Sequence, residues 1–332
     1  MEYNPTGGSP DRQGPVPGSP QVSLGLPVYN GELYLRKALD SLLTQTFADF
    51  ELIISDNAST DRTEEICHEY ASKDARIQYI RQTENKGIIW NFNFVLEQAQ
   101  AQYFMWAAAD DQWEPSYIAT LVNGLEQDSD AVIAFSGYDV IFINGNEEKV
   151  TTINGYMEDI PSKNLFGRLR NFILYPDKLG KVNMFYGLMR RDVLQQGWES
   201  TMGGVAWPRN LFGEDALFVF KILTMGDLCF EPKILFHKYN YINPAMSKCK
   251  ITDVNILYNI IKNTINYFPN VKSYLNTYVG LINKIDKLTI AENNYLKKLI
   301  HRRVRYMYMD YISLTLKNVM KKLSGQRLSI AK

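Results

Sequence analysis

Hydrophobic and polar positions follow two alternating patterns over the first half of the chain. Short aliphatic runs indicate buried strands, expected at Val22–Val28, Phe50–Ser55, Ile77–Arg81, Tyr103–Ala107 and Ala131–Phe135. Between these runs apolar residues recur at helical spacing, with helices expected over residues 32–46, from 61, over 91–98 and from 115. This alternation predicts an α/β fold with a mostly parallel central sheet and helices on both faces.

The pattern also suggests the domain organisation. Residues 1–20 are rich in Pro and Gly and are expected to form a disordered leader, because such a composition buries little apolar surface. Residues 21–250 are expected to form one domain, closed by a helix over 215–225 and a strand near 228–236. Residues 251–332 follow as a helical, basic C-terminal region.

Composition and charge exclude several classes of protein. The chain has 332 residues, of which 45% are hydrophobic and 22% charged, which excludes collagenous and wholly disordered proteins. Lys and Arg together number 36, as do Asp and Glu, so the strong positive field of a general nucleic-acid binder is not expected. The charge is uneven, however, because residues 284–332 hold 12 basic and 3 acidic residues, a local +9, which leaves −9 for the residues before them.

Cysteine content and hydropathy favour a reducing compartment. The three cysteines, Cys67, Cys229 and Cys249, are widely spaced and form no CxxC pair, which argues against a disulfide framework or a zinc site. No run approaches the roughly 18 apolar residues of a spanning helix, and no apolar stretch resembles a signal peptide. We therefore expect a cytoplasmic protein, with any membrane contact peripheral, on the inner face of the plasma membrane.

The candidate chemistry lies just beyond the expected strands, because ligands of open α/β sheets bind at the carboxyl ends of the strands. After the first strand, the segment from Pro27 to Glu32 contains an Asn-Gly turn and Tyr29, whose ring can stack on a base. An ordinary strand-to-helix turn is the alternative. After the second strand, Asp56 and Asn57 can each accept a hydrogen bond from a base N–H.

Three further segments add to this set. Asp61 with Glu64 is expected to form a capping box at the start of a helix. In the segment 85–87, Gly87 allows close backbone approach to a ligand. Asp110 and Asp111 are adjacent carboxylates at a strand end, where a divalent cation with bound phosphates is a natural partner and a helix cap explains at most one of the two.

In order and spacing these segments resemble those of the family 2 glycosyltransferases, inverting enzymes of the GT-A fold that use nucleotide-diphosphate sugars. The resemblance covers residues 21–247 and rests on Pro27–Glu32, Thr44–Leu52, Ser55–Asp61, Asn85–Gly87, Asp110–Asp111 and Glu214–Asp215. It implies a GT-A domain with a C-terminal helical extension and a UDP-, dTDP- or GDP-linked sugar donor. A saccharide or lipid-linked saccharide acceptor is implied too, as in bacterial surface-polysaccharide biosynthesis.

The resemblance also implies roles for individual residues. Donor binding is implied for Pro27, Tyr29, Glu32, Asp56, Asn57, Gly87 and Asp110. Asp110, with Asp111 beside it, is implied to bind the divalent cation, Mg²⁺ or Mn²⁺, that bridges the donor diphosphate. Asp215 is implied to be the catalytic base, with Glu214 as its neighbour and rival for that role.

The chain departs from the family pattern at two positions. Ala108 stands where the first Asp of the DxD motif is usual, and Ala58 stands where a glycine commonly follows the second motif's acidic pair. Ala108 weakens the expected metal site, although Mg²⁺ keeps several waters and Asp110 could complete a shell with diphosphate oxygens. It also motivates a competing hypothesis, a non-catalytic nucleotide-sugar-binding or scaffold subunit. An NAD-type oxidoreductase is disfavoured because no GxGxxG follows the first strand.

Two other groups of residues have open interpretations. Three aromatic residues are expected either to stack on acceptor sugars or to fill the core: Tyr186, Trp198 and Trp207. In the C-terminal region an apolar stripe comprises Leu296, Leu299, Ile300, Val304, Met307 and Tyr311, and basic residues on the opposite side are Lys297, Lys298, His301, Arg302 and Arg305. Such a helix lies on an anionic membrane surface, or it packs on the catalytic domain or on a second subunit of a homo-oligomer.

Overall fold

The computed structural model describes residues 18–144, 147–152, 157–175, 180–203, 214–241 and 271–323. The disordered leader expected over residues 1–20 lies outside this part of the chain, apart from residues 18–20. The boundary expected near residue 250, and with it Trp207 and Cys249, lies outside it as well.

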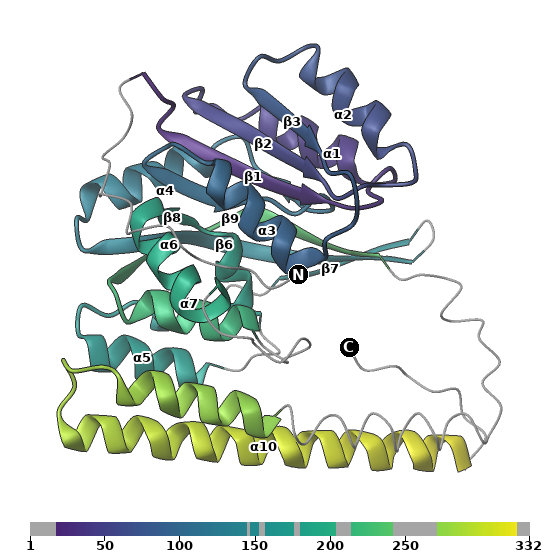
Figure 1. The fold of residues 1–332 in the computed structure, drawn as a ribbon. Helices are drawn as coiled ribbons and strands as arrows, with labels where there is room; N and C mark the ends of the chain where they lie inside the picture. The colour runs from purple at the N-terminus through teal and green to yellow at the C-terminus, as the bar shows by residue number, and fades with distance from the viewer. Residues whose placement is uncertain are drawn as a thin grey trace.

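A nine-stranded mixed sheet forms the centre of the described residues (Figure 1). Its order is β3-β2-β1-β4-β8-β6-β9-β5, with β7 paired to β6. The strands are β1 (Val22–Val28), β2 (Phe50–Asp56), β3 (Ile77–Arg81), β4 (Tyr103–Trp106), β5 (Gln112–Trp113), β6 (Ala131–Asn144), β7 (Glu147–Thr152), β8 (Leu188–Arg190) and β9 (Asp227–Tyr241).

Six of these strands point in one direction, which matters for the position of the site. β1, β2, β3 and β4 are mutually parallel, and β6 is parallel to β9. β8 is antiparallel to both β4 and β6, so β4 and β6 run the same way. The expected mostly parallel sheet is therefore confirmed in strand direction, and the carboxyl ends of these six strands lie at one edge of the sheet.

The strand boundaries agree with the sequence pattern where strands are short and buried. β1 and β3 have the expected limits, whereas β6 and β9 extend far beyond Phe135 and Phe236. These two strands pair with each other from Ala131↔Asp227 to Ile143↔Tyr241, with register shifts around Gly137. Mutual pairing satisfies the backbone groups of both strands. β9 therefore extends through the polar sequence 237–241, and β6 continues past Ser136 and Gly137, which interrupt its aliphatic run.

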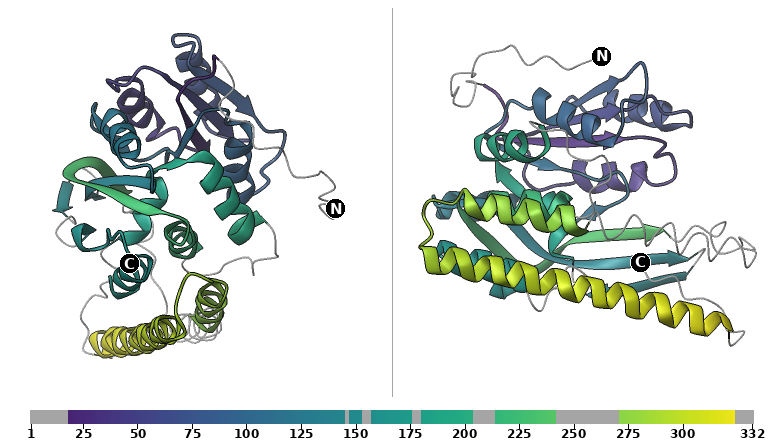
Figure 2. Two further views of the ribbon diagram at one scale, coloured as in Figure 1. Left: turned by 90° about the vertical axis from the view of Figure 1, so that its left-hand side faces the viewer. Right: turned by 60° about the horizontal axis from the view of Figure 1, so that its bottom comes forward.

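Helices cover both faces of the sheet. They are α1 (Leu35–Leu43), α2 (Thr63–Ala71), α3 (Ile88–Gln98), α4 (Tyr117–Gln127), α5 (Leu165–Leu174), α6 (Arg191–Trp198), α7 (Glu214–Leu223) and α10 (Ile290–Leu323). Contacts place α1, α2 and α4 against one face and α3, α6 and α7 against the other. α5 packs on α7, and α10 packs on α5, so α10 forms an outermost layer (Figure 2).

The core explains why these segments fold as they do. In α1, Leu35, Ala38, Leu39 and Leu42 are buried at spacings of three and four residues, so one apolar face of the helix packs on the core. In β1, a Cβ at Gly25 would lie 2.6 Å from Cζ of Phe104, so glycine is required for the close approach of β1 to that ring.

The apolar stripe of the C-terminal helix α10 faces the protein. Leu296, Ile300 and Val304 are buried, and the Arg303 guanidinium donates hydrogen bonds of 2.8 and 2.9 Å to the carbonyl oxygens of Ile173 and Tyr175. Of the alternatives left open by the sequence, packing on the domain therefore accounts for this stripe. Among the described residues, no helix is both long enough and apolar enough to cross a membrane.

Candidate active site

The polar segments that the sequence singles out converge on the carboxyl-end edge of the sheet. The turn after β1, the end of β2, the pair after β4 and the distal part of β9 all lie there. This edge is the ligand-binding position of open α/β sheets. The residues differ sharply, however, in how the protein holds their side chains.

The turn after β1 is braced against the loop that leads into α2. The backbone N–H of Asn30 donates to Oγ of Ser59 at 2.8 Å, and the Asn30 side-chain oxygen accepts from the N–H of Thr60 at 2.8 Å. Glu32 accepts from the N–H of Arg62 at 2.9 Å through Oε2. Glu32, implied by the resemblance to bind the donor, is thus a brace between the two loops in this structure.

The expected capping box at Asp61 and Glu64 is not formed. The Asp61 carboxylate accepts from the N–H groups of Glu32 and Thr63, both at 3.0 Å, while Glu64 lies 3.2 Å from Nε of Arg81. The prediction was wrong because Asp61 connects two loops, and α2 starts only at Thr63.

Pro27 and Tyr29 occupy different environments. Pro27 pairs on one side only: the β1–β4 register stops at Gly25, whereas Pro27 and Val28 still pair with Ser55 and Asp56 of β2. Tyr29, the next residue, is 48% exposed. Its ring is therefore available to a ligand at the strand edge.

Asp56 is fully buried and heavily hydrogen-bonded. Its Oδ1 accepts from the N–H of Ser59 at 2.8 Å, and its Oδ2 accepts from the Tyr79 hydroxyl at 3.1 Å and from Nη1 of Arg81 at 3.2 Å. A carboxylate has about four acceptor sites, so one remains. Asp56 thus has one acceptor site without a protein donor, on a side chain that has no exposed surface.

Asn57 holds the segment 85–87 in place. Its amide nitrogen donates to the side-chain oxygen of Asn85 at 2.9 Å and to the carbonyl of Gly87 at 3.2 Å, and its oxygen accepts from the N–H of Lys86 at 2.9 Å. Gly87 has a φ of 91° immediately before α3, a conformation that favours glycine. Both amide protons of Asn57 are used, so it too can only accept a further bond.

The pair after β4 separates into two roles. Asp111 is completely buried, and it accepts from Nζ of Lys238 at 3.3 Å and from the N–H of Tyr239 at 3.0 Å. Burial raises the pKa of Asp111 to about 7, despite the opposing effect of Lys238. Asp110 is half-buried, and burial also raises its pKa. Asp110 is thus the member of the pair with access to a ligand.

Asp215 lies in the first turn of α7 and interacts electrostatically with Lys238. Its side chain has exposed surface, yet desolvation by the surrounding protein raises its pKa. Lys238 also interacts with Asp110 and Asp111, so one cation is shared by three carboxylates. Glu214 begins α7, but its side chain lies outside the described part of the structure.

Lys238 is the main site residue that the sequence did not single out. Its Nζ lies 5.0 Å from the ring centroid of Tyr186, and neighbouring carboxylates raise its pKa although burial opposes this. The sequence offered one indication of its role: Lys238 follows the strand expected near 228–236, which comes next after the helix that carries Asp215, the expected base. Its neighbour His237 instead contacts Asp139 and Glu114 at 2.8 and 3.0 Å, an arrangement between β-strand and loop residues.

The aromatic candidates also divide. Trp198 is buried and packs 5.0 Å from the ring of Trp106, so it belongs to the core. Tyr186 is half-buried beside Lys238, and burial raises its pKa to about 12. Tyr186 therefore remains the candidate for contact with a sugar.

The metal-ligand set of this edge is sparse. Within the described ranges, no three His, Cys, Asp or Glu side chains are grouped as they would be around an ion. Ala108 supplies no ligand, and Asp111 is engaged by Lys238. Because Mg²⁺ is often held by one or two carboxylates plus substrate phosphates and water, the residues present fit a cation held through Asp110.

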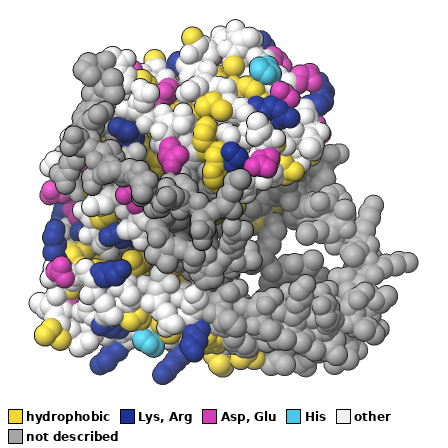
Figure 3. Space-filling model, viewed as in Figure 1, with side chains coloured by type: hydrophobic (Ala, Val, Ile, Leu, Met, Phe, Trp, Pro, Cys, Tyr) yellow, Lys and Arg dark blue, Asp and Glu magenta, His cyan; other side chains and the backbone are white. Residues whose placement is uncertain are grey.

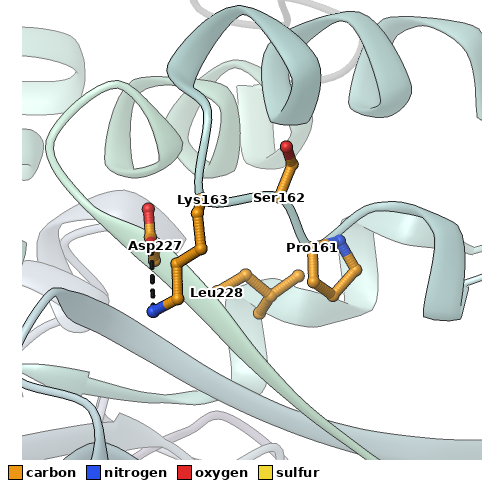
Figure 4. Close-up of a pocket in the computed structure, with 5 residues that line it drawn as sticks. All are labelled: Pro161, Ser162, Lys163, Asp227 and Leu228. Atoms are coloured by element: carbon orange, nitrogen blue, oxygen red, sulfur yellow. Dashed lines mark ion pairs between the residues drawn. The ribbon is translucent and has the colours of Figure 1, made fainter.

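A hollow elsewhere on the surface is not part of this site. It is lined by Pro161, Ser162, Lys163, Asp227 and Leu228 (Figure 4). Lys163 lies 3.2 Å from Asp227, which is also held by Arg168 at 2.6 Å. Asp227 starts β9, whereas Lys238 lies near the other end of that strand, so the hollow is at the opposite edge of the sheet.

Known proteins share this arrangement of elements. The S. aureus TarS 1–349 structure in complex with UDP-GlcNAc superposes with a TM-score of 0.60 and 16% identity, over 85% of this chain and 72% of that one. An uncharacterized glycosyltransferase of Rickettsia typhi is 38% identical over 124 residues, 37% of this chain and 38% of the relative. TuaG of Bacillus subtilis, provisionally named a teichuronic acid biosynthesis glycosyltransferase, is 32% identical over 126 residues, 38% of this chain and 50% of the relative.

The matched segments thus span half or less of the length of these curated relatives. The structural likeness shows that the fold is GT-A, as the sequence predicts. The model of the family described as Glycosyl transferase family 2 matches residues 23–198, which is more than half of the chain and contains the turn after β1, the β2 end and the Asp110–Asp111 pair. The chain belongs to glycosyl transferase family 2.

Proposed function

We propose that this protein is an inverting glycosyltransferase that moves a sugar from a nucleotide-diphosphate donor to a saccharide or lipid-linked saccharide. The observation that carries the proposal is the group formed by Asp110, Asp215 and Lys238 at the carboxyl edge of a GT-A sheet. Two carboxylates with raised pKa values and one cation are the groups needed to take a proton and to receive a charged leaving group.

The nucleoside is proposed to bind between the turn after β1 and the segment 85–87. Tyr29 supplies an exposed ring for stacking, and the remaining acceptor capacity of Asp56 and Asn57 suits an N–H on the edge of a base. Pro27 and Gly87 shape the backbone on either side, and Glu32 acts through its brace to the next loop.

The diphosphate is proposed to lie near Asp110 and Lys238. Asp110 would hold a divalent cation, Mg²⁺ or Mn²⁺, and such an ion supplies electrostatic stabilisation of the charge that gathers on the leaving group. Lys238 contributes a fixed positive charge in the same place, oriented by Asp111 at 3.3 Å. Asp111 is accordingly proposed to position Lys238, which leaves Asp110 to hold the ion.

The acceptor is proposed to meet Asp215. A hydroxyl is a weak nucleophile, so a carboxylate within hydrogen-bond reach must take its proton as the new bond to the anomeric carbon forms. The raised pKa of Asp215 brings it closer to neutral pH, which suits a general base. Attack on the face opposite the departing diphosphate inverts the anomeric configuration. Tyr186, beside Lys238, is the proposed stacking surface for the acceptor sugar.

A role in bacterial surface-polysaccharide biosynthesis is the proposed setting. It is supported by the likeness to TuaG over 38% of this chain. The same setting provides lipid-linked saccharides as acceptors.

A screen of nucleotide sugars for thermal stabilisation tests the proposal. A ligand at 100 times its dissociation constant should add about 2.7 kcal/mol to the free energy of unfolding. The positive donor is then tested for hydrolysis with Mn²⁺. Stabilisation followed by hydrolysis supports the proposal. Stabilisation without turnover favours the non-catalytic subunit that Ala108 suggests, and no stabilisation by any nucleotide sugar contradicts nucleotide-sugar binding altogether.

Replacement of Asp110 tests the cation. We expect Asp110→Ala to reduce turnover at least 100-fold, because removal of one strong electrostatic group in an active site costs on the order of 10²- to 10³-fold. Nucleoside diphosphate binding should also lose its dependence on Mn²⁺ in calorimetry. Asp111→Ala is the matched comparison, and it should leave that dependence in place. Equal dependence on Mn²⁺ in wild type and Asp110→Ala would rule out the proposed metal role.

A further inference from the structure

The outer face of α10 is separate from the stripe that packs on the domain. Leu296, Ile300 and Val304 are buried, whereas Lys298, Arg302 and Arg305 are exposed. At about 100° of rotation per residue, these two groups lie on opposite sides of the helix. α10 is the outermost layer of the molecule, so its second face is directed away from the sheet (Figure 2).

This outer face is basic. Lys298, His301, Arg302 and Arg305 are all exposed on it, and Lys and Arg side chains gather along the lower edge of the molecule (Figure 3). Among the side chains of α10 that the structure describes, one is acidic: Glu292, which accepts from the N–H and hydroxyl of Thr289 and caps its own helix. Among the side chains described for α10, no carboxylate therefore lies opposite the cations of this face.

The same face exposes large apolar and aromatic side chains. They are Tyr306 at 57%, Met309 at 64% and Ile312 at 42% exposure. Lys298, Arg302, Arg305 and Met309 follow one another at spacings of four, three and four residues, so charge and apolar surface form one strip. From Lys298 to Ile312 the strip is about 21 Å long, at 1.5 Å per residue.

We propose that this strip docks the protein on an anionic lipid bilayer. Basic residues within a Debye length of such a surface are attracted to its headgroups, and tyrosine prefers the interface between headgroups and acyl chains. The chain as a whole has a formal net charge of zero, so the attraction must come from a local concentration of charge such as this one. The proposal goes beyond the transfer reaction and does not depend on it.

The apolar side chains favour a bilayer over a nucleic acid. A phosphate backbone is contacted by Lys and Arg, and it offers no apolar layer for Met309 and Ile312, which are exposed at 64% and 42%. A bilayer accommodates both kinds of side chain at one depth. Docking through this strip leaves α5 and the catalytic domain on the side of α10 away from the lipid.

Flotation of the full chain with vesicles tests the proposal. We expect binding to phosphatidylglycerol–phosphatidylcholine vesicles at low salt, and little binding to phosphatidylcholine alone or at high salt. The triple variant Lys298→Gln, Arg302→Gln, Arg305→Gln should lose roughly 100-fold in partitioning, since each basic residue contributes about fivefold near such a surface. The control variant Lys37→Gln, Arg62→Gln, Lys73→Gln removes three exposed charges at α1 and α2, and should retain wild-type binding.

A fluorescence measurement separates lipid insertion from attraction to any polyanion. Tyr306→Trp should show a blue-shifted emission with anionic vesicles, because the ring enters a less polar layer, and no shift with duplex DNA. Absence of vesicle binding, equal losses in the two triple variants, or binding without a blue shift would each overturn the proposal. The last result would favour a polyanion-binding face.

Discussion

The two halves of the candidate site hold their carboxylates in opposite ways. At the end of β2, buried Asp56 is surrounded by three donors from Ser59, Tyr79 and Arg81. Across the edge, Asp110 and Asp215 are partly desolvated, and burial raises the pKa of both. The first arrangement stabilises the fold and presents a shaped surface to a ligand. The second arrangement leaves the carboxylates of Asp110 and Asp215 accessible to a ligand.

This difference predicts where substitutions act. Loss of a satisfied carboxylate leaves its donors unpaired and lowers the free energy of unfolding. Loss of a desolvated carboxylate removes a charge that the fold does not need, and its effect appears in catalysis. Stability should therefore respond to substitution of Asp56, and turnover to substitution of Asp110 or Asp215, although all three lie in motifs of one family.

The largest expected effect is on turnover. Asp215→Asn keeps the shape of the side chain and its ability to hydrogen-bond the acceptor, but it cannot take a proton. We expect kcat to fall by roughly 10²- to 10⁴-fold with donor affinity nearly unchanged, the signature of an interaction made in the transition state. Initial rates and calorimetric titration with the donor provide the two numbers.

Glu214→Gln is the matched control, because it makes the same chemical change one residue earlier in the chain. It should retain most of its turnover. A dead Glu214→Gln with an active Asp215→Asn would transfer the role of base to Glu214. Two active variants would contradict base catalysis by this pair.

The next effect is on stability. Asp56→Ala should lower the free energy of unfolding by about 3 kcal/mol, because it removes a buried carboxylate together with its hydrogen bonds from Ser59, Tyr79 and Arg81. Glu64→Ala is the control: Glu64 pairs with the same Arg81 at 3.2 Å, but its side chain is 46% exposed, so about 1 kcal/mol or less is expected. Urea unfolding measures the free energy of unfolding of both variants. Equal losses would show that buried Asp56 stabilises the protein no more than the partly exposed Glu64.

Asp111 makes stability depend on pH. Its folded-state pKa is about 7, above the usual value near 4, so the folded protein binds a proton that the unfolded chain releases between these values. Stability from this group therefore falls as pH rises from about 4 to about 7. From about pH 5 to about pH 8, wild type should lose about 2 kcal/mol more than Asp111→Asn. If the free energy of unfolding changed equally with pH in the two proteins, the pKa of Asp111 would not be raised in the folded state.

The smallest effect concerns Ala58. Its φ is 60°, in the left-handed region that disfavours residues with a Cβ, and this explains why glycine is common at this position in the family. Ala58→Gly should raise the free energy of unfolding by about 0.5 kcal/mol, the relief of strain being partly offset by the greater freedom of glycine in the unfolded chain. A destabilised variant would indicate that the surrounding loop stabilises this conformation. Turnover should not change.

Much of the fold was predictable from local sequence. The apolar runs of β1 and β3 and the helical spacing in α1 depend on residues close together in the chain, and all three are found as expected. The lengths of β6 and β9 were not predictable, because each strand is extended by the other, which lies far away in the sequence. The same applies to Asp61, whose partner Glu32 belongs to a different loop.

The residues of the candidate site could be named from the sequence, whereas the contacts between their side chains could not. The family motifs mark Asp56, Asp110 and Asp215, and the parallel direction of β2 and β4 places the first two at one edge of the sheet. That Asp111 is bound to Lys238 follows from the pairing of β5 with β9, which no local pattern indicates. For this reason the sequence assigned no individual role to Lys238, and the assignment of Asp111 to the metal together with Asp110 stays a prediction.

The stereochemistry of donor hydrolysis tests whether the protein inverts the anomeric centre with the help of Asp215. With an α-linked nucleotide sugar found in the thermal screen, water replaces the acceptor, and proton NMR follows the first anomer released before the sugar mutarotates. We expect the β-anomer to appear first with wild type, and we expect Asp215→Asn to release it at a greatly reduced rate. Initial release of the α-anomer, or an undiminished rate in Asp215→Asn, would contradict inverting transfer assisted by Asp215.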